Sequence, residues 1–224
     1  MRPQERDLAA FHAAFGVIAA GALALRGDVP VGVVMTTLVV TYHLGSVGLA
    51  RSQGHTAWLR WWGFGAVLSL FMLIPDAVLV EGLGVLVFPA DGVPDVGPVT
   101  IYMAGLWTAP TVLIIAAAEA VGHRRGDAAA AVTAVVAAAV VFGVAEATLT
   151  LLPAWEPVGV TTIGGLAPYL LLPELLLGWM VFAAARWTRT SRPVAYVPVA
   201  ALVALTYTGA AAASWLLIER GLLS

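Results

Sequence analysis

Seven apolar runs, each long enough to cross a bilayer as a helix, constrain the fold of this chain more than any other feature. A helix needs about 20 mostly apolar residues to span the hydrocarbon core. Of the 224 residues, 61% are hydrophobic and 11% are charged, whereas a soluble domain has about 25% charged residues. The sequence therefore predicts one all-α integral membrane domain over residues 1–224, a bundle of seven transmembrane helices. The predicted spans are 8–25, 30–50, 58–82, 98–122, 128–152, 166–187 and 194–218.

The arginines predict how this bundle is oriented in the membrane. The sequence has no Lys, so all 11 basic side chains are Arg. Cytoplasmic segments concentrate basic residues near the ends of the spans. We therefore expect the N-terminus inside and the C-terminus outside, in the inner or plasma membrane of the cell. With seven spans, the arginines that fall on the predicted inner side are Arg2, Arg6, Arg51, Arg60, Arg124, Arg125, Arg186, Arg189 and Arg192.

Several classes of function are excluded by the residues that the chain lacks. The absence of Cys excludes disulfides, thiolate metal sites and cysteine nucleophiles, and the absence of Lys excludes a Schiff-base cofactor. A net charge of −2 does not suggest nucleic-acid binding. His12, His55 and His123 fall near predicted cytoplasmic ends or in loops, which leaves His43 as an interior histidine without a ligand cluster. We expect no metal and no cofactor.

Carboxyl groups inside the predicted spans are the strongest indication of a functional site. A charged side chain near the bilayer centre costs at least about 2.5–3.5 kcal/mol, so such groups usually face the bundle interior. Asp76, Glu146 and Glu174 all fall in the outer halves of their spans, where no base accompanies them. Burial without a counter-charge favours the neutral acid, and we expect at least one of the three to be protonated at pH 7. The alternative is that each acid only hydrogen-bonds a neighbouring helix.

Two further acids are expected to lie elsewhere. Glu81 is predicted close to the outer headgroups. Glu119 comes near the inner end of its span, one turn before His123 and beside Arg124 and Arg125. This placement predicts a solvated interfacial ion pair for Glu119 rather than a functional site.

A proline directly precedes two of the intramembrane acids, in "LIPDAVL" and "LLPELLL". Proline removes a backbone hydrogen bond and kinks a helix. The apolar run over residues 61–88 is too long for one straight span. The helix is therefore expected either to tilt or to break after Pro75 and continue as an interfacial or re-entrant segment. The shared Pro-acid pattern also fits an inverted repeat of three plus three helices.

Aromatic side chains are the other candidates for a site. Such faces can stabilise a developing cation. For Trp107 and Trp179, packing in the core or against lipid is the alternative. The residues predicted to line a substrate pocket around the acids are Tyr102, Trp107, Tyr169, Trp179 and Tyr207.

The segment "PDAVLVEGLGVLVFPADG", followed by "GPVTIYMAGLWTAP", resembles an uncharacterised group of prokaryotic seven-helix membrane proteins. This resemblance covers the third and fourth spans and implies a fold without an assigned chemistry. In architecture only, a small seven-helix protein with buried acids is similar to the membrane-bound terpene cyclases, in which acidic residues protonate an epoxide or olefin. The acids of this chain do not align with the motif of that family, so no residue role is carried over.

Two functions are compatible with these features. The first is a membrane-embedded enzyme for a lipid or isoprenoid, in which Asp76 or Glu174 is the general acid and Glu146 tunes it. The second is a proton-coupled carrier of a small molecule, suggested by the Pro-acid pair. A structural or partner-binding membrane protein is the remaining alternative. No dimer motif stands out, so the sequence predicts no oligomeric state.

Overall fold

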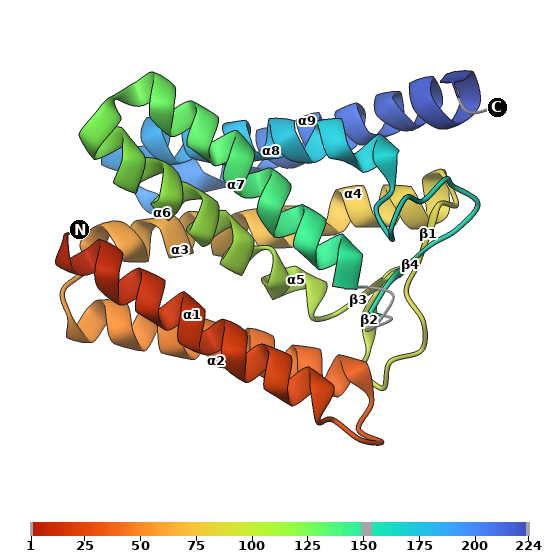
Figure 1. Ribbon diagram of the computed structural model, residues 1–224, viewed down its shortest axis with the longest axis horizontal. Helices are drawn as coiled ribbons and strands as arrows, with labels where there is room; N and C mark the ends of the chain where they lie inside the picture. The colour runs from red at the N-terminus through yellow and green to blue at the C-terminus, as the bar shows by residue number, and fades with distance from the viewer. Residues whose placement is uncertain (1, 149–153, 223–224) are drawn as a thin grey trace.

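The computed structural model describes residues 2–148 and 154–222. Within these residues, seven helices are long and apolar enough to cross a membrane, which confirms the predicted number of spans. In Figure 1, α1 and α2 lie side by side at one edge of the bundle, and α8 and α9 lie at the opposite edge. The main helices are α1 (Pro3–Ala24), α2 (Val31–Ser52), α3 (Thr56–Phe71), α6 (Thr108–Arg125), α7 (Asp127–Thr148), α8 (Pro168–Trp187) and α9 (Tyr196–Leu217).

The helix boundaries differ from the predicted spans by a few residues at most ends. The largest differences are at the starts of the first and fourth spans. The helix α1 begins at Pro3 because Pro is favoured in the first turn, where its missing N–H costs nothing. The fourth span begins only with the short helix α5 (Met103–Leu106), because the preceding residues form a hairpin. The predicted residues 149–152 lie outside the described residues.

The third span is one helical rod of 27 residues, Thr56–Gly82. Its α-helical pattern is interrupted by a turn at Met72, resumes in α4 (Leu73–Ala77) and ends in a π-helical turn over Val78–Gly82. The helix therefore continues past Pro75, so of the two expected alternatives the break after that residue does not occur. The interruption lies before Pro75 because a proline ring clashes with the backbone of the preceding turn.

Two short antiparallel pairings form the end of the bundle that lies opposite the arginines. The strand β1 (Leu86–Val87) pairs with β4 (Glu156–Pro157), and β2 (Asp95–Val96) pairs with β3 (Val99–Thr100). Buried Asp91 organises the hairpin. Its Oδ2 accepts a hydrogen bond of 2.8 Å from the Thr100 hydroxyl, and its carbonyl oxygen accepts one of 3.0 Å from Gly32 N at the start of α2. These loops are thus fixed against the helices.

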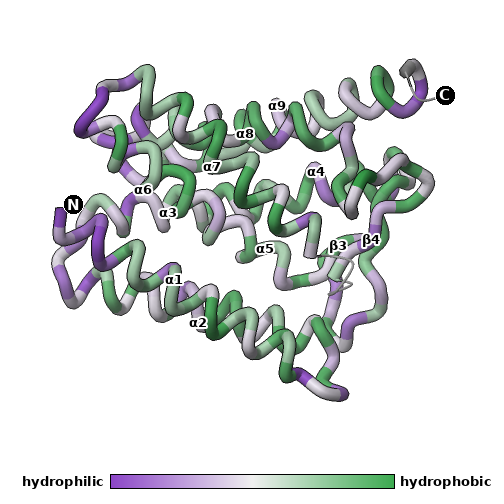
Figure 2. The backbone as a smooth tube through the Cα atoms, in the orientation of Figure 1, coloured by the Kyte–Doolittle hydropathy of each residue, from purple (hydrophilic) through white to green (hydrophobic). Residues whose placement is uncertain are grey.

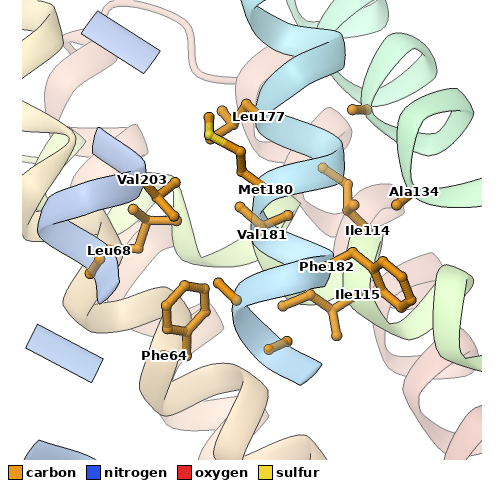
Figure 3. Close-up of a cluster of buried hydrophobic side chains, with 14 of the residues drawn as sticks. Phe64, Leu68, Ile114, Ile115, Ala134, Leu177, Met180, Val181, Phe182 and Val203 are labelled. Carbon is orange, nitrogen blue, oxygen red and sulfur yellow. The ribbon is translucent and has the colours of Figure 1, made fainter. Parts of the chain in front are cut away.

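The hydrophobic core lies among α3, α6, α7, α8 and α9 (Figure 3). Phe64 and Leu68 of α3 meet Val181 of α8 and Ile115 of α6 there. The helices α7 and α8 approach each other closely: a Cβ added to Gly178 would overlap the Ala138 Cβ and lie 2.7 Å from the Ala134 carbonyl oxygen. By contrast, Leu8 is the only buried residue of α1 among those described, so α1 is attached loosely to the bundle.

Hydrophilic segments gather at the end of the bundle that carries the N-terminus (Figure 2). There Arg124 lies 3.5 Å from Glu5, and Arg186 lies 3.0 Å from Asp127. The arginines of the N-terminal segment and of three connections thus share one end, as the positive-inside interpretation requires. Which side of the membrane this end faces stays a prediction.

Candidate functional site

Asp76, Glu146 and Glu174 line one cavity of about 510 Å³. They come from α4, α7 and α8, and their exposed fractions are 4%, 8% and 7%. Tyr207 of α9 lines the same cavity. The sequence predicted only that the acids occupy a common depth; the fold also turns them toward a common space.

We call this space the acid cavity. Asp76 lies on its aromatic side. The Trp107 indole Nε1 donates a long hydrogen bond of 3.4 Å to Asp76 Oδ2. The Trp107 ring is in turn held edge-on against Tyr207, with centroids 6.0 Å apart, and tilted against Phe142 at 5.5 Å. Asp76 is thus held by a single weak donor within an aromatic wall.

Glu146 has a well-defined structural role. Its Oε2 accepts a hydrogen bond of 2.9 Å from the backbone N–H of Ala167, the residue that precedes α8. Amides at a helix N-terminus have no partner within the helix, and the helix dipole favours a negative group there. Glu146 therefore connects the end of α7 to the beginning of α8.

Glu174 is the least engaged of the three acids. It follows Pro173 inside α8, which continues through the proline without a break. Among the described residues it has no hydrogen-bond or ion-pair partner, although Glu146 is close enough for the two charges to interact. An acid that is buried, unbonded and exposed to a cavity is free to exchange a proton with a ligand.

The predicted aromatic residues fall into two groups. Trp107, Tyr169 and Tyr207 line the acid cavity. Tyr102 lies behind its wall, where its hydroxyl donates a hydrogen bond of 2.8 Å to the Ala154 carbonyl oxygen. Burial raises the pKa of the Tyr102 hydroxyl well above its usual value, and Asp91 raises it further, so Tyr102 stays protonated and acts as a structural donor.

Trp179 is placed away from the acids. It is not among the residues that line the acid cavity, and 49% of its surface is exposed on the outside of α8. It lies two residues after Leu177 and five after Glu174, which places it about 140–200° around the helix from that buried face. A wide aromatic ring on that outer surface would contact lipid in a membrane, and we therefore assign it no part in the site.

His12 is a cavity residue that the sequence analysis missed. It lines the acid cavity from α1. Its Nδ1 lies 2.9 Å from the Leu8 carbonyl oxygen and its Nε2 lies 3.1 Å from the Tyr42 hydroxyl. Because the helix begins at Pro3 rather than at residue 8, His12 lies about 14 Å along α1 instead of near its end. The sequence pattern gives no sign of it, since α1 has no clear apolar face.

The walls of the acid cavity are largely apolar. The loop residues Val85, Phe88 and Trp155 line it together with the helices. On the side, the cavity extends between α1 and α7 to Gly16 and Val144, which are exposed on the surface that lies in lipid if the seven helices span a membrane. Figure 1 shows these two helices on either side of α5 and α6. A ligand would thus enter sideways from the bilayer.

The other polar residues singled out in the sequence lie outside the acid cavity. Glu81 is exposed near the end of the third span. Glu119 pairs with His123 at 3.6 Å, as predicted, and with Arg186 at 3.6 Å in place of Arg124 or Arg125. His43 has both ring nitrogens occupied, by the Gly105 carbonyl oxygen at 3.2 Å and the Trp62 indole at 3.1 Å. The described residues hold no group of His, Asp and Glu side chains suited to a metal ion.

Comparison with known proteins gives a family but no activity. No curated protein and no solved structure matches the chain. A match to a family described as Domain of unknown function (DUF6989) covers residues 73–218. The matched region contains Asp76, Glu146, Glu174 and Tyr207, and it leaves out α1, α2 and α3. On this match, which covers more than half of its length, the chain belongs to the DUF6989 family.

Proposed function

We propose that this protein is a membrane-embedded enzyme that acts on a lipid or isoprenoid by acid catalysis. The observation that carries the proposal is the meeting of three buried carboxyl groups from three helices in one apolar, aromatic cavity. The volume of about 510 Å³ lies within the usual range for small-molecule sites, which bury most of the ligand surface. A water-insoluble substrate would reach it directly between α1 and α7.

The three acids have different roles in this proposal. Glu174 or Asp76 is the general acid, because neither carboxyl group is held by a strong donor. Glu146 accepts the hydrogen bond of the Ala167 amide and tunes the general acid from the same cavity. Burial without a counter-charge favours the protonated form of the general acid, which is the form that an acid catalyst needs.

The reaction type that fits is protonation of an olefin or epoxide. The O–H bond of the carboxylic acid breaks as the proton bonds to the alkene carbon or the epoxide oxygen, and positive charge develops on the neighbouring carbon. The faces of Trp107, Tyr169 and Tyr207 can stabilise that charge. Loss of a proton from the product to the carboxylate restores the acid, so an isomerisation or cyclisation is balanced in atoms and electrons.

The test is lipid analysis of cells and of the purified full chain. We expect the wild-type protein to co-purify with an enriched isoprenoid or other lipid and to change the lipid profile of the membrane that contains it. The double variant Asp76→Asn, Glu174→Gln should lose the conversion by about 10²–10⁴-fold, the usual contribution of a general acid. Glu81→Gln, which removes an exposed acid from the same span, serves as the matched control. Full conversion by the double variant would reject the acid assignment.

A second candidate, a proton-coupled carrier, is favoured by one observation. Another cavity of about 520 Å³ lies at the arginine-rich end, and Leu113 lines both it and the acid cavity. Two cavities that meet at one side chain could open alternately to the two sides of the membrane. Proton flux into protein-containing liposomes upon addition of a transported solute, without chemical change of that solute, would favour this function over the enzyme.

A further inference from the structure

The cavity at the arginine-rich end, which we call the arginine cavity, has a composition unlike that of the acid cavity. Residues of α1, α3, α6 and the connection from α8 to α9 line its volume of about 520 Å³. Four guanidinium groups face two carboxylates there, which leaves an excess of positive charge. The charged residues in question are Arg2, Arg60, Arg124, Arg189, Glu5 and Glu119.

Both carboxylates of this cavity already have cationic partners. Glu5 lies 3.5 Å from Arg124 and 3.5 Å from His123, and it also accepts a hydrogen bond of 3.0 Å from the Arg2 backbone N–H. Glu119 lies 3.6 Å from Arg186 and 3.6 Å from His123. These contacts form one network along α1 and α6, so neither acid is available to the remaining arginines.

The Arg2 guanidinium lies 3.0 Å from His123 Nε2 and Arg124 pairs with Glu5, so Arg60 and Arg189 are the remaining arginines. They come from different elements, α3 and the 3₁₀ turn Thr188–Thr190, and both line the arginine cavity. Neither makes a hydrogen bond or an ion pair with any residue that the structure describes. The planar guanidinium group binds carboxylate or phosphate oxygens through paired N–H donors. Both arginines are exposed and line the same cavity, where their side chains can reach an anion.

The inner wall of the arginine cavity is apolar. Leu8, Trp61 and Phe64 line it, and Leu113 connects it to the acid cavity. From Leu113 to Arg124, the helix α6 rises about 16 Å. A free inorganic anion has no apolar surface to bury against this wall. The hydrocarbon chain of an amphiphile would bury its apolar surface there.

We propose that the arginine cavity binds the phosphate headgroup of a membrane amphiphile, with Arg60 and Arg189 holding the phosphate oxygens and the chain lying toward Leu113. Basic pockets between spanning helices at the cytoplasmic surface are suited to anionic lipid headgroups, and this is the side on which the arginine pattern places the cavity. A chain anchored there points toward Asp76 and Glu174. A lipid phosphate is then also the substrate class of the enzyme, a step that rests on the proposed function.

Native mass spectrometry of the purified full chain tests the binding site directly. The probes are dioleoyl phosphatidic acid, phosphatidylcholine with the same chains, and inorganic phosphate. We expect phosphatidic acid to bind most tightly, and Arg60→Ala, Arg189→Ala to lower its affinity by about thirtyfold, the effect of two arginines near an anionic lipid. The matched control is Arg51→Ala, Arg125→Ala, which removes the same charge from the same end but outside the cavity, and should change the affinity by less than about threefold.

Three results would overturn the proposal. The first is an equal loss of affinity in both double variants, which would show general attraction without a site. The second is phosphatidylcholine binding as tightly as phosphatidic acid. The third is inorganic phosphate binding as tightly as the lipid, which would make a free anion the ligand. Phosphatidic acid should still bind to Asp76→Asn, Glu174→Gln. Binding without conversion in the wild type would uphold the site and reject the proposed function.

Discussion

Glu146 and Glu174 line the same cavity, but their hydrogen-bond environments differ. Glu146 accepts a backbone hydrogen bond of 2.9 Å that fixes the start of α8, whereas Glu174 has no such contact among the described residues. Removing a buried acceptor leaves the amide donor unsatisfied, at a cost of about 1–3 kcal/mol. Substitution of Glu146 should therefore lower stability, whereas substitution of Glu174 should lower activity.

We predict that Glu146→Leu lowers the free energy of unfolding by about 1–3 kcal/mol, because the Ala167 N–H loses its acceptor. Glu146→Gln keeps a carbonyl oxygen at that position and should lose less than about 1 kcal/mol. Glu174→Gln should leave stability unchanged while removing the acid. Thermal unfolding in detergent, followed by tryptophan fluorescence, measures all three. Equal losses for the two Glu146 variants would contradict the hydrogen-bond explanation.

The contact between α7 and α8 depends on a residue without a side chain. A Cβ at Gly178 would overlap Ala138, whereas a Cβ at Gly209 of α9 would meet nothing within 4 Å. We predict that Gly178→Ala destabilises the bundle by about 1–3 kcal/mol through overpacking. Gly209→Ala, the matched control, should be neutral or stabilising by up to about 1 kcal/mol, the difference in helix propensity. Similar unfolding temperatures for both variants would show that the two helices can separate without cost.

The opening between α1 and α7 can be tested with another pair of glycines. Gly16 and Gly21 both have open space around them on α1, but only Gly16 lines the acid cavity. We predict that Gly16→Trp slows lipid conversion by about tenfold, a barrier increase of about 1.4 kcal/mol, without lowering the unfolding temperature. Gly21→Trp should leave conversion unchanged. If both variants convert lipid at the wild-type rate, the substrate does not enter between these helices.

The elements show which parts of the fold follow from local sequence. The number of spans followed from seven apolar runs because a bilayer sets the helix length. The shape of the third span could not be predicted in the same way. Pro75 indicates a distortion of the helix but does not indicate whether the helix continues beyond it. The pairing of β1 with β4 joins segments about 70 residues apart, and no local pattern predicts such a contact.

In the candidate site, too, some features could be predicted from the sequence and others could not. The depths of Asp76, Glu146 and Glu174 could be predicted from topology, but their convergence depends on how each helix is rotated about its axis. That rotation also decides the placement of Trp179, which is half-exposed, and of His12, which lines the acid cavity. In a bundle surrounded by lipid, apolar side chains face both the core and the outside, so the sequence carries little information on rotation.

At the scale of the whole molecule, the two cavities have opposite character and lie toward opposite ends of one bundle. Carboxyl groups line one and unpaired arginines the other, with Leu113 between them. If the arginine-rich end faces the cytoplasm, phosphate headgroups of the inner leaflet lie at the level of Arg60 and Arg189. The acids then lie in the outer half of the membrane. Orientation therefore decides which leaflet supplies the ligand.

Because the chain has no Cys, single cysteines can report this orientation without background. Ser191 is exposed in the connection at the arginine-rich end, and Thr162 is exposed in the loop at the opposite end. We predict that a membrane-impermeant maleimide labels Thr162→Cys in intact cells, and Ser191→Cys only after the membrane is permeabilised, since positive loops stay inside. The reverse pattern would place the arginine cavity outside, away from the anionic leaflet. Labelling of both cysteines from the outside would show that α8, the one span between residues 162 and 191, does not cross the membrane, and would contradict the seven-span bundle.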